Sequence, residues 1–158
     1  MVKKYVFGTP IETDAVVKEI KETSWKDDIF QKEGNVFHYL LKTDEIVYGL
    51  GENVRGINKR GWRYVSNCSD NPNHCEHTNS LYGAHNFIMM GDGVSETYGL
   101  FVDTPGTVTF DVGYTDIDRL IIAMENENYK IYLIEGQTYQ DVVLSLIHIS
   151  EPTRPLYI

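Results

Sequence analysis

The stretch from Ser66 to Ser80 gathers several side chains of the types that bind ligands or do chemistry. It reads Ser-Asn-Cys-Ser-Asp-Asn-Pro-Asn-His-Cys-Glu-His-Thr-Asn-Ser and follows neither the helical nor the strand period. A polar loop of this length inside a compact domain is usually functional or disordered. We therefore expect the 66–80 loop to hold any binding site that the chain contains.

Four of these side chains, Cys68, His74, Cys75 and His77, are donor types that bind zinc. Structural zinc sites usually space their ligands as Cys-x₂₋₄-Cys and His-x₃₋₅-His, whereas here a histidine and a cysteine are adjacent. The alternative is that all four are unpaired side chains of a polar loop. We favour that alternative, and expect neither a metal centre nor a cofactor.

The segments around the loop resemble strands of an all-β sandwich. Short runs rich in Val, Ile, Tyr, Phe and Thr recur between turn residues, as is typical of antiparallel sheets. We predict strands over 4–7, 35–41, 46–48, 62–65, 86–90, 97–102, 107–112, 120–124 and 129–134. Turn residues such as Pro105-Gly106 and Gly113 separate them.

Two segments favour helix. Gln137 to Val143 carries apolar residues at helical spacing after Thr138, which is a good N-cap residue. Asp14 to Ile20 has a similar but shorter pattern, for which a strand is the alternative. We thus expect one or two short helices beside the sheets.

Composition excludes several classes of function. The formal net charge of −9 argues against a nucleic-acid surface, which needs clustered Lys and Arg. No apolar run approaches the ~20 residues of a membrane span, so we expect no membrane partner. Two cysteines are too few for a disulfide scaffold. We expect a cytoplasmic protein.

The tail from Leu144 to Arg154 matches the in-frame translation of a transposase adapter used in preparing DNA sequencing libraries. We therefore interpret residues 144–158 as foreign and residues 1–143 as the native domain. The alternative is a native amphipathic helix continuing through Leu146 and Ile149, which Pro152 would end.

Four motifs carry a resemblance to a known family over essentially all of residues 1–143. They are Tyr48-Gly-Leu-Gly-Glu52, Arg55-Gly-Ile-Asn-Lys-Arg60, Ser80-Leu-Tyr-Gly-Ala-His-Asn-Phe87 and Gly99-Leu-Phe-Val-Asp-Thr-Pro105. In this order and spacing the set resembles the N-terminal domain of glycoside hydrolase family 31, specifically its bacterial α-glucosidases.

This resemblance implies a galactose-mutarotase-like β-sandwich that packs against a (β/α)₈ barrel following it in the chain. In the family that barrel holds the catalytic carboxylates, and the nucleophile motif Trp-x-Asp-Met-Asn is absent here. We therefore expect the fragment to be inactive and assign it no catalytic residue. The parent would be a retaining α-glucosidase that removes terminal α-linked glucose from oligosaccharides.

The chain has many other carboxylates, such as Asp111, Asp116 and Asp118. Retaining hydrolysis needs two carboxyl groups about 5 to 5.5 Å apart. These three lie around a predicted turn without an aromatic pocket signal, and we interpret them as solvated turn acids.

The resemblance also implies that the 66–80 loop reaches over the barrel mouth and contributes to the sugar pocket. Asp70 is the main candidate, since a carboxylate accepts strong hydrogen bonds from sugar hydroxyls. His74 and Glu76 are secondary candidates. The alternative for Asp70 is an Asx turn before Asn71-Pro72. Trp62, Tyr64 and Tyr82 either stack on sugar or, as we favour, pack within the protein.

Two other functions stay open at this stage. One is a free-standing carbohydrate-binding sandwich, and the other is a purely structural domain that supports the barrel. The expected partners in the leading interpretation are an α-linked gluco-oligosaccharide and the C-terminal barrel of the same chain.

Overall fold

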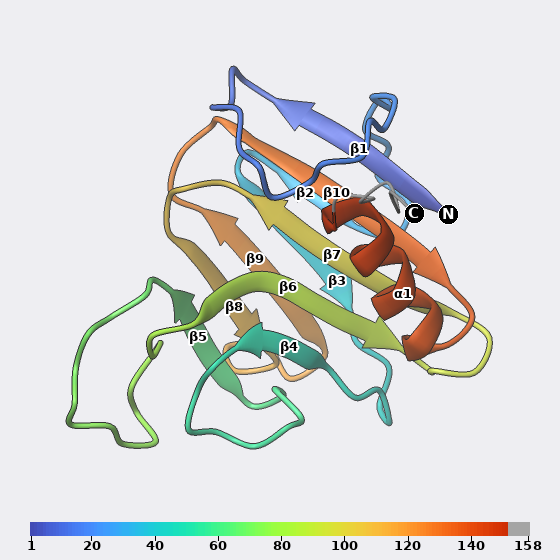
Figure 1. The fold of residues 1–158 in the computed structure, drawn as a ribbon. Helices are drawn as coiled ribbons and strands as arrows, with labels where there is room; N and C mark the ends of the chain where they lie inside the picture. The colour runs from blue at the N-terminus through green and yellow to red at the C-terminus, as the bar shows by residue number, and fades with distance from the viewer. Residues whose placement is uncertain (152–158) are drawn as a thin grey trace, which may run out of the picture.

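The computed structural model describes residues 1–151 and consists of two packed antiparallel sheets with one helix (Figure 1). The first sheet has the strand order β1-β10-β7-β6-β4, and the second has the order β2-β3-β9-β8-β5. The strands are β1 (Val2–Phe7), β2 (Gln31–Glu33), β3 (Val36–Leu40), β4 (Tyr48–Gly51), β5 (Trp62–Ser66), β6 (Ala84–Gly91), β7 (Thr97–Asp103), β8 (Val108–Val112), β9 (Arg119–Met124) and β10 (Tyr129–Gly136). The all-β sandwich predicted from the sequence is confirmed.

The alternation of side chains along β10 shows where the core lies. Tyr129, Ile131 and Leu133 face the second sheet and join the main core between the two sheets. Tyr132 and Ile134 point to the opposite face, into a smaller apolar cluster. Because β10 is buried on both faces, residues 131–134 are a continuous apolar run without polar alternation.

Helix α1 (Tyr139–Ser150) covers that outer face, where it packs against β10 and β7 (Figure 1). Thr138 is its N-cap: the Thr138 side chain accepts from the Asp141 amide, and the Asp141 carboxylate accepts from the Thr138 amide. This capping box confirms the start of the predicted helix. The helix runs past Val143 to Ser150, and Ile149 is buried against the sheet.

One predicted segment was wrong, and one strand was missed. Asp14 to Ile20 forms neither helix nor strand; the amides of Val17 and Lys18 donate instead to the Ile149 carbonyl at the end of α1. Val16 and Ile20 still pack on the outer cluster, so their spacing reflects docking rather than a helical turn. Strand β2 was missed because its residues Gln-Lys-Glu are polar and mostly exposed.

Strand β4 lies later in the chain than its prediction, which covered Ile46 to Tyr48. The predicted strands otherwise agree with the structure to within about two residues, the usual variation in assigned element ends. No helix in residues 1–151 is long and apolar enough to cross a membrane. The last seven residues of the tail lie outside the described part.

Candidate functional site

The 66–80 loop leaves the end of β5 and belongs to the long connection that leads to β6 (Figure 1). Its base is tied to the sandwich through Ser80, whose hydroxyl donates to the Val65 carbonyl and accepts from the Asn67 amide at 3.0 Å. The Ser69 amide donates to the Leu81 carbonyl at 3.1 Å, and Leu81 is buried. The two ends of the loop are therefore held close together.

The three candidate residues all lie on this loop, and all are exposed. The Asx turn in this stretch is made by Asn71, whose side-chain oxygen accepts from the Asn73 amide at 3.0 Å. Within residues 1–151 the Asp70 carboxylate accepts no hydrogen bond from the protein, so both of its oxygens are free to bind a ligand.

His74 and Glu76 have different surroundings. The His74 ring lies edge-on to Tyr82, with ring centroids 5.6 Å apart. The main-chain carbonyl of Glu76 accepts a hydrogen bond from Arg55 at 2.8 Å, while its carboxylate makes no ion pair within the described chain. The structure thus places all three candidates on one exposed loop.

Sequence reasoning missed Arg55 as a residue of this site. It precedes β5, and its guanidinium carbon lies 4.3 Å from the centre of the Trp62 ring and 4.8 Å from that of Tyr64. The Trp62 ring in turn lies edge-on to His77 of the loop at 6.0 Å. The motif that contains Arg55, Arg55 to Arg60, indicated family membership but did not predict the contact of Arg55 with the two rings.

The aromatic candidates divide by burial. Tyr64 is only 2% exposed and belongs to the core, whereas Tyr82 is 50% exposed beside the loop. Trp62 is half-buried and stacks with Arg55. The prediction that the aromatic side chains pack within the protein is therefore correct for Tyr64 and Trp62. Tyr82 is the one of the three whose ring is largely exposed.

A buried lysine lies near the Tyr64 ring, with its Nζ 5.9 Å from the ring centre. Lys59 is 6% exposed and donates to the Asn53 side chain at 3.0 Å and to the Gly56 carbonyl at 2.9 Å. Burial lowers the pKa of Lys59, and the nearby Arg55 lowers it further. Burial raises the pKa of Tyr64, whose hydroxyl has no hydrogen-bond partner among the described residues.

A polar hollow of about 270 Å³ lies at the base of the loop. It is lined by residues of β5, β6, the β7–β8 turn and the start of the loop, namely Ser66, Asn67, Cys68, Ala84, Asn86, Thr104, Pro105, Gly106 and Thr107. The Asn86 side-chain oxygen is buried there without a partner in the described chain. The loop thus rises beside a surface rich in hydroxyl and amide groups.

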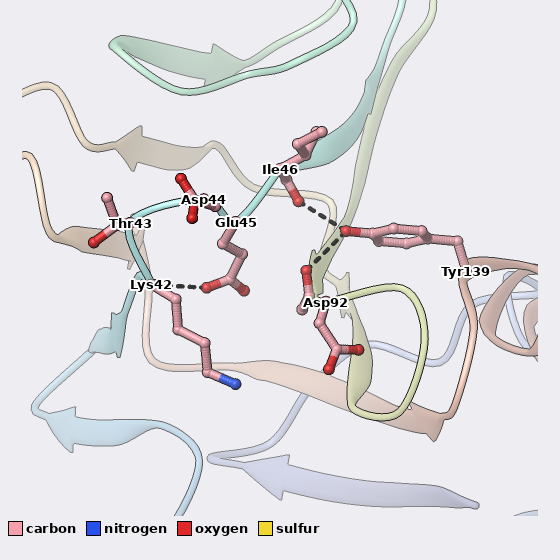
Figure 2. Close-up of a pocket in the computed structure, with 8 residues that line it drawn as sticks. Lys42, Thr43, Asp44, Glu45, Ile46, Asp92 and Tyr139 are labelled. Carbon is pink, nitrogen blue, oxygen red and sulfur yellow. Dashed lines mark hydrogen bonds between the residues drawn. The ribbon is translucent and has the colours of Figure 1, made fainter.

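The hollow shown in Figure 2, about 410 Å³, is lined by several polar groups that already bond within the protein. The Tyr139 hydroxyl lies within hydrogen-bond distance of the Ile46 and Gly91 carbonyls. The buried Glu45 carboxylate accepts from the Tyr39 hydroxyl and the Lys42 amide. These contacts hold the 42–46 turn in place.

The other carboxylates are structural, and one of them was misjudged. Asp111 is buried, not solvated, and accepts from the amides of Tyr114 and Thr115, from the Thr115 hydroxyl and from Arg63. Burial raises its pKa, but the hydrogen bonds led by Thr115 outweigh burial, so the net pKa is lowered.

Asp116 and Asp118 form a second part of the same turn. Asp116 pairs with Arg119 at 3.1 Å, and its other oxygen accepts from the Asp118 amide. Asp118 is exposed and Asp116 is half-buried, as expected for turn acids. No set of three or more His, Cys, Asp or Glu side chains within residues 1–151 is arranged to hold a metal ion.

The comparisons with known proteins identify the class. The family model described as the glycosyl hydrolase 31 N-terminal galactose mutarotase-like domain matches residues 8–111. That match covers more than half of the sequence. The chain belongs to this family of domains, as the sequence motifs predicted.

Two curated relatives are each 31% identical to the chain. They are an alpha-glucosidase of Saccharolobus solfataricus, matched over 65% of this chain, and the alpha-xylosidase XylQ of Lactiplantibacillus pentosus, matched over 63%. The matches span only 15% and 12% of these relatives' own lengths.

Solved structures agree on the fold. A cycloalternan-degrading enzyme from Trueperella pyogenes, in complex with isomaltose, superimposes with a TM-score of 0.70 at 19% identity, over 84% of this chain and 21% of that one. A family 31 dextranase mutant of Flavobacterium johnsoniae, in complex with isomaltotriose, gives 0.65 at 24% identity, over 83% and 16%. At these identities the likeness establishes the sandwich alone.

Proposed function

We propose that this chain is the substrate-pocket and scaffold domain of a retaining α-glucosidase that removes terminal α-linked glucose from oligosaccharides. The observation that carries the proposal is the 66–80 loop, which is tied at its base and exposes Asp70, His74 and Glu76. Membership of the glycosyl hydrolase 31 N-terminal domains supports it. A catalytic barrel later in the parent chain would supply the reacting carboxylates.

The role of Asp70 can be tested in the complete gene product. We expect Asp70→Asn to lower kcat/KM for isomaltose by about tenfold or more, because it removes a charge-assisted hydrogen bond to a sugar hydroxyl. Asp44→Asn is the matched control, since Asp44 is an exposed acid on a different turn. Equal activity of the two variants would exclude Asp70 from the pocket.

The fragment itself is proposed to be inactive. Incubation of the pure 158-residue chain with a chromogenic α-glucoside should give no turnover above the buffer rate. Measurable hydrolysis that survives repurification would overturn this part of the proposal.

A free-standing carbohydrate-binding sandwich is the second candidate, supported by the exposed Tyr82 ring beside the loop. Titration of the chain with maltose and isomaltose, followed by NMR, discriminates between the two. Saturable binding at micromolar sugar would favour the binding module. A complete absence of binding would exclude the free-standing module. It is compatible with the first proposal, in which this domain supplies only part of the sugar pocket.

The domain boundary at Val143 and the foreign origin of residues 144–158 stay proposals. Helix α1 continues through Ser150, so part of that tail packs on the sheet whatever its origin. Sequencing the gene from an independent assembly tests the point. The same codons inside a longer reading frame would refute the adapter interpretation.

We also propose a cytoplasmic location, which is supported by the two exposed free thiols of Cys68 and Cys75. Cell fractionation of the native host with an antibody to the domain tests this. Recovery of the protein outside the cytoplasm would contradict it.

A further inference from the structure

The outer part of the 66–80 loop contacts the rest of the domain through one hydrogen bond and two edge-on ring contacts, His74 with Tyr82 and His77 with Trp62. Among residues 1–151, the only hydrogen bond from residues 70–79 to a residue outside the loop is the one from Arg55 Nε to the Glu76 carbonyl. The remaining bonds of this part are internal, from Asn73 to Asn71 and between Cys75 and Thr78. Internal bonds shape a loop but do not fix its orientation on the domain.

Arg55 joins the loop to the rigid sheet with a single planar group. While Nε donates to Glu76, Nη1 donates to the Arg63 carbonyl of β5 at 2.6 Å. A guanidinium holds its donors in a fixed fork, so the direction of one bond determines the direction of the other. The position of Glu76 is thereby set relative to the β5 backbone.

The guanidinium is itself held in place by two aromatic rings. Trp62 and Tyr64 alternate with Arg63 along β5, and Arg55 lies over both rings. Cation–π contacts of this kind are favourable and specific to the plane of the group. Arg55 is half-buried, so the two hydrogen bonds are also partly shielded from water.

We infer that Arg55 is the positioning residue of the 66–80 loop and orients Asp70, His74 and Glu76 without contacting substrate. The inference about loop order rests on the contacts above. Only its consequence for sugar binding rests on the proposed function.

The test uses the 158-residue chain, with backbone amide order parameters of residues 70–79 measured by NMR relaxation. In Arg55→Ala we expect these values to fall below about 0.6, the range of flexible backbone. Ser69, which is tied to Leu81 at the base, should keep its wild-type value. Unchanged order parameters at 70–79 would overturn the inference.

The matched control is Arg60→Ala. Arg60 also holds main-chain carbonyls, those of Lys42, Thr43, Glu45 and Ile117, but on turns away from the loop. We expect this variant to lower the melting temperature and leave residues 70–79 ordered. If Arg60→Ala loosens the 66–80 loop as much as Arg55→Ala does, the effect is a general loss of stability and the inference fails.

Arg55→Lys keeps the charge and much of the aliphatic packing but removes the fork. Arg55→Lys should therefore retain part of the loop order that Arg55→Ala loses. If Arg55→Ala does not fold, the order parameters of residues 70–79 in Arg55→Lys are compared with the wild type instead. In the complete enzyme, Arg55→Ala should raise KM for isomaltose more than it lowers kcat. Suppose that Arg55→Ala disorders the loop while Asp70→Asn leaves the activity of the complete enzyme unchanged. The positioning role of Arg55 would then stand, and the proposed function would be rejected.

Discussion

At the scale of single residues, two buried tyrosines show how a hydroxyl can stabilise or weaken the same core. Tyr39 donates to the buried Glu45 carboxylate at 2.7 Å. Burial raises its pKa, and the hydrogen bond to Glu45 raises it further. Tyr129 is fully buried and its hydroxyl has no partner within the described residues; burial raises its pKa to about 12.

The pair gives a prediction with an internal control. Tyr39→Phe should lower the free energy of unfolding by about 1–3 kcal/mol, because it leaves the buried Glu45 Oε1 without its donor. Tyr129→Phe should be neutral, or stabilising by up to about 1 kcal/mol, because it removes an unsatisfied group. Urea unfolding of both variants checks this, and a larger loss for Tyr129→Phe would contradict it.

At the scale of elements, strand β4 contains a backbone irregularity that the glycines permit. The pairing of β4 with β6 shifts between Gly49 and Gly51. Leu50 between them has a φ of +68° and is buried, so packing holds a non-glycine residue in a left-handed conformation. Gly49 has a φ of +123°, and a Cβ there would collide with the Phe87 carbonyl.

We expect Gly49→Ala to lower the free energy of unfolding by about 2 kcal/mol or more, because both the φ value and the collision oppose a side chain. Gly56→Ala is the control, since a Cβ at Gly56 meets nothing within 4 Å. It should change stability by less than about 0.5 kcal/mol. Equal melting temperatures for the two variants would refute the argument.

The end of helix α1 supports a second prediction at this scale. Ile149 is 3% exposed in the outer apolar cluster, whereas Ile147 is 41% exposed. Ile149→Ala should cost about 2–4 kcal/mol through the cavity it leaves, and Ile147→Ala less than about 1 kcal/mol. Thermal unfolding checks the difference. Similar losses would mean that the helix does not pack as described.

At the scale of the whole molecule, several carboxylates make the fold sensitive to acid. Asp92 accepts from the amides of Val94, Ser95 and Glu96 and from the Ser95 hydroxyl. These bonds, led by the one from Glu96, hold the pKa of Asp92 well below its usual range. The pKa values of Glu96, Asp111 and Asp141 are also lowered.

The sign of the resulting pH dependence follows from linkage. A carboxylate with a lowered pKa binds fewer protons in the folded state than in the unfolded state, so its contribution is complete above the unfolded value of about 3.9 and is lost below it. The melting temperature should therefore fall as the pH drops from about 5 to about 2. Asp92→Asn keeps an acceptor oxygen but cannot titrate, so the melting temperature of this variant should fall less steeply over the same pH range. An unchanged slope in that variant would exclude Asp92 as a source.

Much of this architecture could be predicted from the sequence because it depends on local chemistry. Strands such as β7 and β10 have apolar β-branched and aromatic residues, Thr138 is a helix cap by its own side chain, and the polar 66–80 stretch has no period that a sheet could use. The four motifs, taken together in their order and spacing, were sufficient to identify the family.

Only the tertiary structure decided the features that depend on a partner far along the chain. Strand β2 exists because β3 pairs with it, residues 14–20 stay irregular because their amides meet the end of α1, and Asp111 is buried by its own hydrogen-bonded turn. Arg55 is the clearest case. Nothing local distinguishes it from a solvated arginine, since its role comes from two carbonyls and two rings that only the folded sheet brings together.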